Sequence, residues 1–348
     1  MRICDIGGWT DTRVAGHGEV VNFAVRPGAE VQVALWLDGA GRRVVHAVDY
    51  GDTFEVGTGW GAVPERHRLL AAALEHARVP PGASVELSVN CRVPAGSSTG
   101  TSAAVAVAVL GALEVLAGAT PRPSDLARRA HRLEVERLGQ ESGVQDQLAS
   151  AHGGVSHISI GPYPQARVTP LLLPAGLLWE LEQRFVLVFL GQMHGSSALH
   201  EKVIASLGPD GPSSGALEAL RQAARAARAA LGANDLGRFA SAMVAATEAQ
   251  AALHPDLVSS LAHQVVSAAR DEGAIGWKVN GAGGEGGSLT LLCGPDHRAR
   301  ARLLAALAEI PGVSATAVQL SADGLRAWEA TGLGLAAPPH GATHAASL

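Results

Sequence analysis

Four short stretches of the sequence hold residues whose types and spacing suit the handling of phosphate and hydroxyl groups. The clearest is Pro94-Ala-Gly-Ser-Ser-Thr-Gly-Thr-Ser-Ala-Ala104, which lies between an expected strand and an expected helix. Its glycines let the backbone turn tightly and approach a ligand closely. The free N–H groups at the start of the helix suit phosphate, and the Ser102 hydroxyl can serve Mg²⁺. The same pattern fits a turn that caps a core helix, and the Lys of a Walker loop is absent.

Two further glycine motifs stand far from the first. Arg2-Ile-Cys-Asp-Ile-Gly-Gly-Trp-Thr-Asp11 ends in a carboxylate that can accept hydrogen bonds from two hydroxyls, although alone it indicates mostly a turn. Lys278-Val-Asn-Gly-Ala-Gly-Gly-Glu-Gly-Gly287 is either a flexible linker or a crossing that backs onto the first loop. Its place between an expected helix and an expected strand favours the crossing.

The fourth signal is a pair of carboxylates, Glu134 and Asp146, separated by a helix end and the turn over 139–143. Paired carboxylates can divide the work of holding a metal and taking a proton. Each alone is more typical of a solvated surface charge.

The elements that must position these motifs follow from hydrophobic periodicity. Alternation predicts strands, apolar residues three and four apart predict helices, and Gly or Pro ends each segment. The pattern predicts an α+β protein in two halves, divided near Pro174-Ala175-Gly176. The expected strands cover 31–37, 43–50, 85–93, 155–160, 168–173, 185–190, 288–293 and 313–320. The expected helices cover 64–78, 102–116, 124–138, 216–231, 236–253, 257–272 and 297–309.

Composition excludes several classes of protein. The 348 residues are 47% hydrophobic with a net charge of −5, so the chain is neither disordered nor basic enough to predict a nucleic-acid partner. Three distant cysteines argue against a disulfide framework or a zinc site and fit a reducing cytoplasm. The start shows no signal-peptide pattern, and the most apolar stretch, 103–119, falls short of a membrane span. None of the fourteen histidines has metal-site spacing.

The three glycine motifs in this order, with the Gly143-Val-Gln-Asp-Gln147 turn, resemble the GHMP kinase superfamily from Arg2 to about Leu320. The resemblance implies a two-domain α+β fold and an ATP- and Mg²⁺-dependent small-molecule kinase. It implies an N-terminal domain over 1–175 with a left-handed βαβ unit and a C-terminal ferredoxin-like domain over 176–335. A flexible tail over 336–348 would follow, and the active site would lie between the domains.

The resemblance also assigns the phosphate side of the site. Ser98 stands where the family usually has Gly, and Thr99 where it usually has Leu. Ser102 matches the serine that reaches Mg²⁺, and Glu134 matches the glutamate that completes the metal site. Glu136 is the competitor, but its spacing to Asp146 is two residues short. The implied ATP-binding residues are Pro94, Gly96, Ser97, Ser98, Gly100, Thr101 and Ser102.

On the acceptor side, Asp146 matches the catalytic base or charge-stabilising carboxylate, and Arg2 matches the Arg beside it. Asp11 matches the aspartate that binds sugar hydroxyls, whereas Trp9 either stacks on a sugar face or is simply buried. Family members usually carry a short strand before this Arg, so either the true start lies upstream of Met1 or the first strand is clipped. The implied substrate residues are Gly8, Trp9, Thr10, Asp11, Gly283 and Gly284.

The third motif matches the family segment that supports the phosphate loop. Its family positions are Gly281, Ala282, Gly283 and Gly284. Asn280 replaces the usual Ser or Thr, and Glu285 replaces a Gly.

Two similarities narrow the class of acceptor substrate that the resemblance implies. Gly7-Gly-Trp-Thr-Asp-Thr12 is similar to the L-fucokinase kinase domain, and Gln145-Asp-Gln147 with Gly153-Gly154 resembles D-glycero-D-manno-heptose 7-phosphate kinase. Both families phosphorylate an anomeric hydroxyl, so the resemblance implies a sugar 1-kinase. A heptose 7-phosphate needs a basic anchor for its distal phosphate, for which the nearby candidates are Arg13, His17 and Arg26.

Two alternatives stay open at this point. One is a non-catalytic regulator that binds ATP and sugar on the same fold. The other is a GHMP kinase for a non-sugar alcohol, as in isoprenoid or homoserine metabolism. The partner is a small molecule in each case, and the oligomeric state is not indicated by the sequence.

Overall fold

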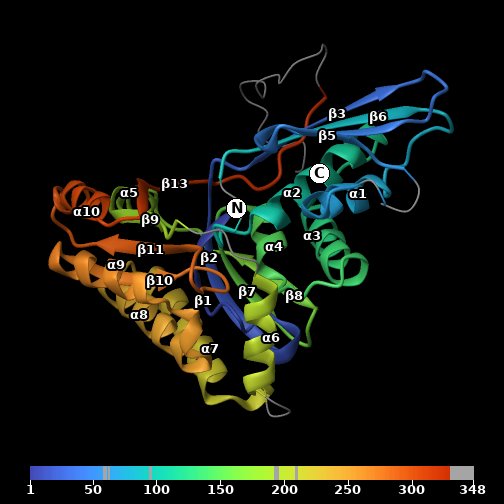
Figure 1. Ribbon diagram of the computed structural model, residues 1–348. Coiled ribbons are helices and arrows are strands. Elements are labelled where there is room, and N and C mark those ends of the chain that lie inside the picture. The colour runs from blue at the N-terminus through green and yellow to red at the C-terminus, as the bar shows by residue number, and fades with distance from the viewer. Residues whose placement is uncertain (58–60, 62, 94–95, 192–195, 208–210, 330–348) are drawn as a thin grey trace.

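A computed structural model describes residues 1–57, 61, 63–93, 96–191, 196–207 and 211–329 of the chain. The Arg2–Asp11 motif begins a sheet whose strands are all antiparallel, in the order β1-β2-β7-β8, with β13 also paired to β2 (Figure 1). This sheet joins an N-terminal strand to a strand near the C-terminal end of the described chain, because Gln319 pairs with Arg26. The strands are β1 (Arg2–Ile6), β2 (Gly18–Arg26), β7 (Val155–Ile160), β8 (Ala166–Pro170) and β13 (Gln319–Leu320).

A second sheet, in the order β3-β6-β4-β5, lies above the helices that follow the phosphate-loop motif (Figure 1). Strands β4 and β6 are parallel, and the other pairs are antiparallel. The alternate burial along β6 explains its period of two, since one face of this strand packs on apolar helix residues. The strands are β3 (Ala29–Trp36), β4 (Arg43–Ala47), β5 (Asp52–Glu55) and β6 (Ser84–Cys91). The helical segments of this half are η1 (Arg13–Ala15), η2 (Val48–Tyr50), η3 (Glu65–His67), α1 (Arg68–Leu74), α2 (Thr101–Leu116), α3 (Pro123–Arg132), η4 (Leu133–Arg137) and α4 (Gln145–His152).

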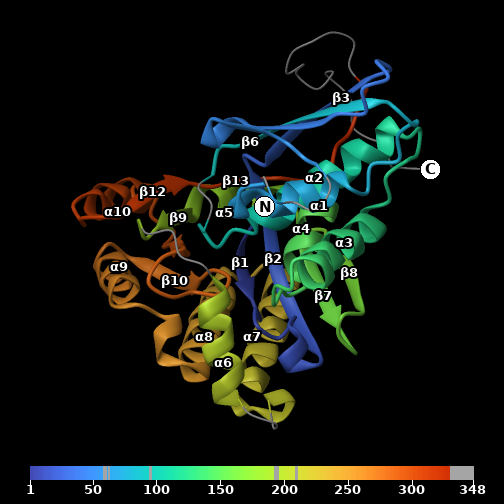
Figure 2. The ribbon, with the colours of Figure 1, turned by 45° about the vertical axis from the view of Figure 1, so that its right-hand side comes forward.

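A third sheet, in the order β10-β11-β9-β12, forms the other half with helices on both sides (Figures 1 and 2). The central strand β11 is wholly buried, as its unbroken apolar character requires. The strands are β9 (Phe185–Phe189), β10 (Ala274–Val279), β11 (Ser288–Cys293) and β12 (Ser314–Ala317). The helical segments are α5 (Ala175–Arg184), α6 (Ser196–Leu207), η5 (Gly211–Ser213), α7 (Gly215–Gly232), α8 (Leu236–Leu253), η6 (Pro255–Leu257), α9 (Ser260–Asp271) and α10 (Ala299–Ala308).

The predicted α+β class is confirmed, and the predicted helix over 236–253 and strand over 288–293 coincide with α8 and β11. Several predicted boundaries were wrong. The strand predicted over 43–50 ends at Ala47. The helix predicted over 64–78 begins as the 3-10 turn η3, and only the seven residues of α1 form an α-helix there. The strand expected over 313–320 divides between two sheets as β12 and β13.

The strands and α-helices that were not predicted include β1, β2, β5, β10, α4 and α6. Helix α5 was not predicted either, and it begins at the Pro174-Ala175-Gly176 segment that predicted a domain boundary. The domain division near residue 175 stays a prediction, and the tail over 336–348 lies outside the described residues. Within the described part of the chain, no helix has both the length and the apolar character of a membrane span.

Candidate active site

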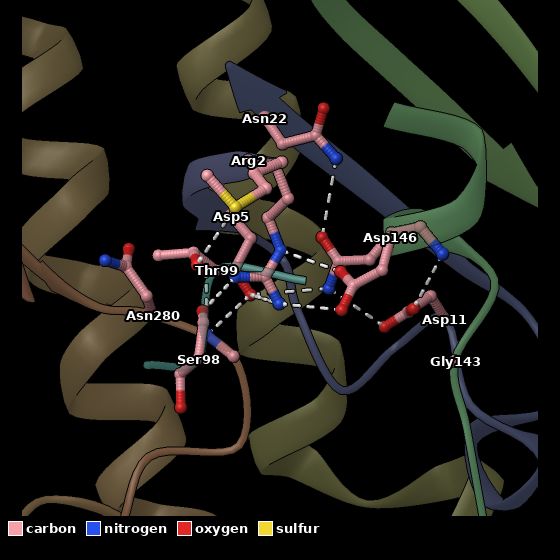
Figure 3. Close-up of polar contacts among 12 residues, drawn as sticks. Arg2, Asp5, Asp11, Asn22, Ser98, Thr99, Gly143, Asp146 and Asn280 are labelled. Carbon is pink, nitrogen blue, oxygen red and sulfur yellow. Dashed lines mark hydrogen bonds and ion pairs between the residues drawn. The ribbon is translucent and has the colours of Figure 1, made fainter. Parts of the chain in front are cut away.

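The four motifs meet at one cleft of about 460 Å³. Strand β1, the loop before α2, the start of α4 and the loop after β10 each contribute to its wall (Figure 3). The lining residues that the sequence singled out are Arg2, Trp9, Asp11, Gly96, Ser98, Gly100, Thr101, Ser102, Glu134, Asp146, Gly281 and Ala282. The glycine crossing therefore does back onto the phosphate-loop motif.

An ion pair between Arg2 and Asp146 lies at the centre of this cleft. The Nε of Arg2 donates to Oδ1 of Asp146 at 2.7 Å, and Nη2 donates to Oδ2 at 3.3 Å. Nη1 of the same guanidinium donates to the carbonyl of Ser98. Arg2 is 3% exposed and the Asp146 side chain 27% exposed, so the carboxylate is the member of the pair that a ligand can reach. The two-pronged contact fixes the plane of the carboxylate, as such geometry does generally.

Asp11 lies beside this pair at the end of the turn that follows β1. Its Oδ2 accepts from the backbone N–H of Gln145 at 3.1 Å, and its Oδ1 accepts from Nε2 of the same residue at 3.4 Å. A Cβ on Gly143 would overlap the Asp11 carboxylate, which explains the glycine at that position. Burial and, after it, the neighbouring carboxylates of Asp146 and Asp5 raise the pKa of Asp11 to about 6, against the opposing effect of the Gln145 N–H.

The loop before α2 is built from left-handed residues. Gly96, Ser98 and Gly100 have φ values of 74°, 55° and 72°. The positive φ of Ser98 gives a physical reason why this family position usually holds Gly, since L residues enter that region at a cost. The first N–H groups of α2 have no partner inside the helix and carry its positive dipole end.

Not every predicted residue of this loop reaches the cleft. Ser97 and Thr99 are 5% and 1% exposed, and their hydroxyls hydrogen-bond to one another at 2.8 Å. These two buried hydroxyls stabilise the loop on its side away from the cleft. Thr99, at a position where the family usually has Leu, therefore has Ser97 as a polar partner. Pro94 lies outside the described residues.

Glu134 is placed by the π-helical turn η4 and is 3% exposed. Its Oε2 accepts from the Ser142 hydroxyl at 2.8 Å and from Nε2 of Gln147 at 2.5 Å. Oε1 is buried without a hydrogen-bond partner. Burial raises the pKa of Glu134, and the hydroxyls of Ser142 and Ser102 oppose that rise. Glu136, the competing candidate, is exposed and is absent from the lining of the cleft.

The Glu134 and Ser102 oxygens fit Mg²⁺. A buried carboxylate oxygen without a partner next to a serine hydroxyl is a hard-oxygen donor set, and Mg²⁺ commonly takes only one or two protein ligands with phosphates and water supplying the rest. In keeping with so sparse a set, the described residues hold no cluster of three or more His, Cys, Asp or Glu side chains that could bind a metal alone.

Of the predicted substrate residues, Trp9 and Asp11 line the cleft. Trp9 is 4% exposed and its ring centroid lies 4.7 Å from that of His200, so it forms a buried wall rather than an open stacking platform. Gly8 lies behind the wall, where a Cβ would be 2.5 Å from an Asp5 carboxylate oxygen. The Thr10 hydroxyl donates to the Gly7 carbonyl at 2.7 Å, away from the cleft.

Gly283 and Gly284 are also absent from the lining of the cleft. Gly284 donates its N–H to the Leu257 carbonyl at 3.0 Å, and a Cβ on Gly283 would overlap that carbonyl. Their small size therefore permits close packing against the turn before α9.

The three candidate anchors for a distal phosphate are not brought together. Arg13 donates from Nη2 to Oε1 of Glu141 at 2.6 Å, and Glu141 lines the cleft. His17 and Arg26 do not line it, and Arg26 instead pairs with Asp323.

Sequence reasoning missed two groups at this site. Asp5 and Lys278 form a buried ionic contact behind the cleft, and a carboxylate inside the otherwise apolar run Ile3-Cys-Asp-Ile6 was the signal that could have revealed Asp5. The other group is an apolar wall beyond the phosphate loop, to which residues on β6 and α1 contribute. Its members include Tyr50, Leu69, Leu70, Val89 and Val93.

Both the sequence and the fold of this chain are similar to those of known kinases. Residues 67–154 match the family described as GHMP kinases N terminal domain. A bifunctional fucokinase/GDP-fucose pyrophosphorylase of Arabidopsis thaliana is 26% identical over 310 residues, which are 84% of this chain and 29% of that protein. A D-glycero-alpha-D-manno-heptose 7-phosphate kinase of Campylobacter jejuni is 28% identical over 203 residues, 58% of this chain and 60% of that protein. The chain thus spans less than two thirds of the length of either curated relative.

Mevalonate kinases match as well, such as that of Pyrococcus abyssi, which is 26% identical over 286 residues, 82% of this chain and 78% of that protein. Among solved structures, a D-glycero-D-manno-heptose 1-phosphate kinase from Bacteriodes thetaiotaomicron superposes with a TM-score of 0.71. That match covers 94% of this chain and 96% of the other at 21% identity, so it shows a shared fold and nothing more. The chain is thus similar to GHMP kinases in the matched segment over residues 67–154, and it shares their fold.

Proposed function

We propose that the chain is an ATP-dependent kinase that transfers the γ-phosphoryl group to a sugar hydroxyl, the anomeric C1 hydroxyl of a fucose-like sugar or of a heptose 7-phosphate. The observation that carries this proposal is the reachable Asp146 carboxylate, held by buried Arg2 opposite the left-handed loop before α2. In the proposal, residues 1–175 supply Arg2, Asp146 and the loop, and residues 176–335 supply the Gly281 segment. The three cysteines are free and buried, which supports the cytoplasm as the compartment.

The proposed mechanism is direct transfer. The loop between Gly96 and Ser102 and the start of α2 bind the phosphates of ATP, and Asp11 orients the sugar by accepting from its hydroxyls. Asp146 accepts the proton of the attacking hydroxyl, while the two-pronged contact with Arg2 orients this carboxylate. Most of the acceleration comes from positioning and electrostatics, as in phosphoryl transfer generally.

Ser102 and Glu134 are the residues that would hold Mg²⁺. When bound, the ion withdraws negative charge from the phosphate oxygens. The chain itself buries the Glu134 carboxylate away from solvent and orients it through hydrogen bonds from Ser142 and Gln147.

The charges around Asp11 support an uncharged acceptor over a sugar phosphate. The carboxylates of Asp11, Asp146 and Glu141 line this end of the cleft. The Arg2 guanidinium is engaged by Asp146 and the Ser98 carbonyl, and the Arg13 guanidinium is engaged by Glu141. A distal phosphate would have to compete with a carboxylate for either cation, whereas neutral hydroxyls would not.

The test is acceptor-dependent ADP release with Mg-ATP over a panel of fucose, galactose, mannose, arabinose and heptose 7-phosphate, with mevalonate and homoserine as non-sugar alcohols. We expect turnover with one free sugar. Turnover with an alcohol instead would assign the non-sugar branch, and tight ATP and sugar binding without any turnover would assign a regulator.

Sugar binding is expected to weaken as the pH falls through about 6, because the raised pKa of Asp11 leaves it protonated below that value. The neutral form can no longer accept from two hydroxyls, so the KM for the acceptor should rise about tenfold per pH unit. The charged groups that act on Asp11 are Asp146, Asp5 and Arg2. An Asp11→Asn variant should show a high KM without this pH dependence, and a persistent acidic limb there would assign the titration to another group.

The same shift has a consequence for stability. Because the pKa of Asp11 is higher in the folded state than the ordinary 3.8, the folded protein holds this proton more tightly. The stabilisation from this group is full below about pH 4 and is lost as the pH rises through about 6. Asp11→Asn should therefore unfold at a temperature that falls less over this pH window than that of the unsubstituted protein.

Gly100→Ala is expected to lower kcat by about 10–100-fold, since misplacing a reacting group by about an ångström can cost that much. Gly100 has φ 72°, and a Cβ there would lie 3.1–3.2 Å from the Asp146 side chain. Gly118 is a matched control, because it has the same φ of 72° and nothing within 4 Å of an added Cβ. Gly118→Ala should lose similar stability but keep kcat, and equal kinetic losses in the two variants would contradict a role for Gly100 beside Asp146.

A further inference from the structure

Asp5 is a fully buried carboxylate to which the proposed mechanism assigns no role. Residues three apart on a regular strand face opposite sides of the sheet, yet Arg2 and Asp5 both reach the junction of the motifs (Figure 3). The reason is an irregularity in β1, where the register shifts between Ile3 and Ile6 and Cys4 has φ 52°. The Cys4 N–H donates to Oδ1 of Asn280 at 2.9 Å, so the loop after β10 holds this irregularity in place.

The Asp5 carboxylate joins segments that are far apart in the sequence. It accepts from the Gly281 N–H at 3.0 Å and 3.1 Å through its two oxygens, and from Nε2 of Gln145 at 3.3 Å. Gln145 precedes Asp146 and also donates to Asp11 from its backbone and its side chain. Gly8 gives the carboxylate room, since any Cβ there would press on it. Asp5 thus contacts the glycine crossing and the start of α4 at once.

The charge of Asp5 is balanced by Arg2, whose Nη2 lies 3.9 Å from Oδ2, and by Lys278, which is 1% exposed. Nζ of Lys278 lies 3.9 Å from Oδ1 of Asp5, donates to Oε1 of Gln250 at 2.7 Å and also donates to the Val279 carbonyl. Burial lowers the pKa of Lys278, and the Asp5 carboxylate opposes that change. A buried charge without its partner is strongly unfavourable, so Lys278 depends on the Asp5 carboxylate that faces it.

We propose that Asp5 and Lys278 act as a positioning pair that holds the Gly281 loop and Gln145 in register with Arg2 and Asp146. The steric fit explains how a displacement would be transmitted. A Cβ on Gly281 would lie 3.1 Å from both Nη2 of Arg2 and Cβ of Ser98, so the loop has no room to move toward either. The pair therefore fixes the positions of both the Asp146 carboxylate and the phosphate loop. This role rests on the proposed function.

Three variants test this proposal: Asp5→Asn, Lys278→Met and the two combined. Each single change should lower kcat by about 10–100-fold, the scale expected of a small misplacement of reacting groups. The double variant should lose about as much as the worse single variant, not the product of the two, because residues that act as a unit are not additive. It also leaves no lone buried charge, so it supplies the kinetic answer if a single variant does not fold.

Two further readouts separate positioning from mere structure. Asp5→Asn removes a negative charge that raises the pKa of Asp11, so the acidic limb of the acceptor KM should move to lower pH. The affinity for Mg-ADP, measured by calorimetry without any acceptor, should fall about fivefold or more, since the Gly281 loop lies close against Ser98 of the phosphate loop. Glu114→Gln is the control, because Glu114 pairs with Arg129 between α2 and α3 outside the cleft lining.

The outcomes are distinct. If the unsubstituted protein turns over no acceptor, the proposed function fails, and the loss of Mg-ADP affinity in Asp5→Asn still decides whether the pair seats the phosphate loop. If the unsubstituted protein is active, the pair is supported when both single variants lose kcat and the double variant loses no more than the worse of the two. Multiplicative losses, or single variants equal to Glu114→Gln in kcat, acidic limb and Mg-ADP affinity, would overturn it.

Discussion

Asp146→Ala is expected to lower turnover by about 10²–10⁴-fold, the usual contribution of a general base, while Mg-ATP still binds. The side chain makes its principal contacts with Arg2 and lies beside Gly100, and the loop that binds phosphate is formed by other residues. The loss should therefore appear in kcat, measured by ADP release, and not in nucleotide affinity measured by calorimetry.

The control for this variant is Asp125→Ala, which removes an exposed carboxylate from the first turn of α3. Its kinetics should match those of the unsubstituted protein. Asp146→Asn keeps the size of the side chain and separates loss of the charge from loss of the Arg2 contact. Turnover that survives both Asp146 substitutions would remove this residue from the mechanism.

Glu134→Gln is the second large effect. The variant keeps the shape of the side chain but replaces a buried carboxylate, whose Oε1 has no hydrogen-bond partner, by a neutral amide. Because a metal stabilises the transferring phosphoryl group by several kcal/mol, kcat at a fixed Mg²⁺ concentration should fall about 10²-fold or more. Binding of Mn²⁺ to the protein–ADP complex, followed by electron paramagnetic resonance, should weaken in parallel.

Glu136→Gln is a closely matched control, since Glu136 lies two residues away on the same turn and is exposed. This variant should keep both kcat and Mn²⁺ affinity. If Glu134→Gln binds Mn²⁺ as tightly as Glu136→Gln does, the metal is held elsewhere and Glu134 has only a structural role.

Local patterns in the sequence predicted the parts of the site that are built from neighbours in the chain. The strand, glycine loop and apolar helix around Gly100 follow from alternation, turn residues and helical spacing, and β6 and α2 lie at that place. The resemblance preferred Glu134 over Glu136, and Glu134 is buried in η4 whereas Glu136 is exposed.

Two of the elements that the sequence did not predict, β1 and α4, are short, and β1 is also shaped by distant contacts. Strand β1 is five residues long, and the irregularity at Cys4 breaks the alternation that would reveal it. Helix α4 has eight residues and begins with Gln145-Asp146-Gln147, which offers no apolar stripe. Local pattern cannot show a hydrogen bond such as that from Gly281 to Asp5, which joins residues 276 positions apart.

The same limit applies to the roles of the glycines. Gly8, Gly283 and Gly284 read as substrate contacts because they stand in motifs next to residues that line the cleft. In the structure they allow close packing instead, against Asp5 for Gly8 and against Leu257 for the other two. A motif identifies which segments form the site, whereas the fold decides which atoms of each segment face the ligand.

The most direct test of the account is ³¹P nuclear magnetic resonance of a reaction that contains the protein, Mg-ATP and each sugar of the panel, with Asp146→Asn run in parallel. The account predicts an ADP signal together with a sugar phosphate whose coupling places the phosphate on the anomeric carbon, both reduced to background in the variant. Sugar-independent ADP formation, or a sugar phosphate formed equally well by Asp146→Asn, would contradict it.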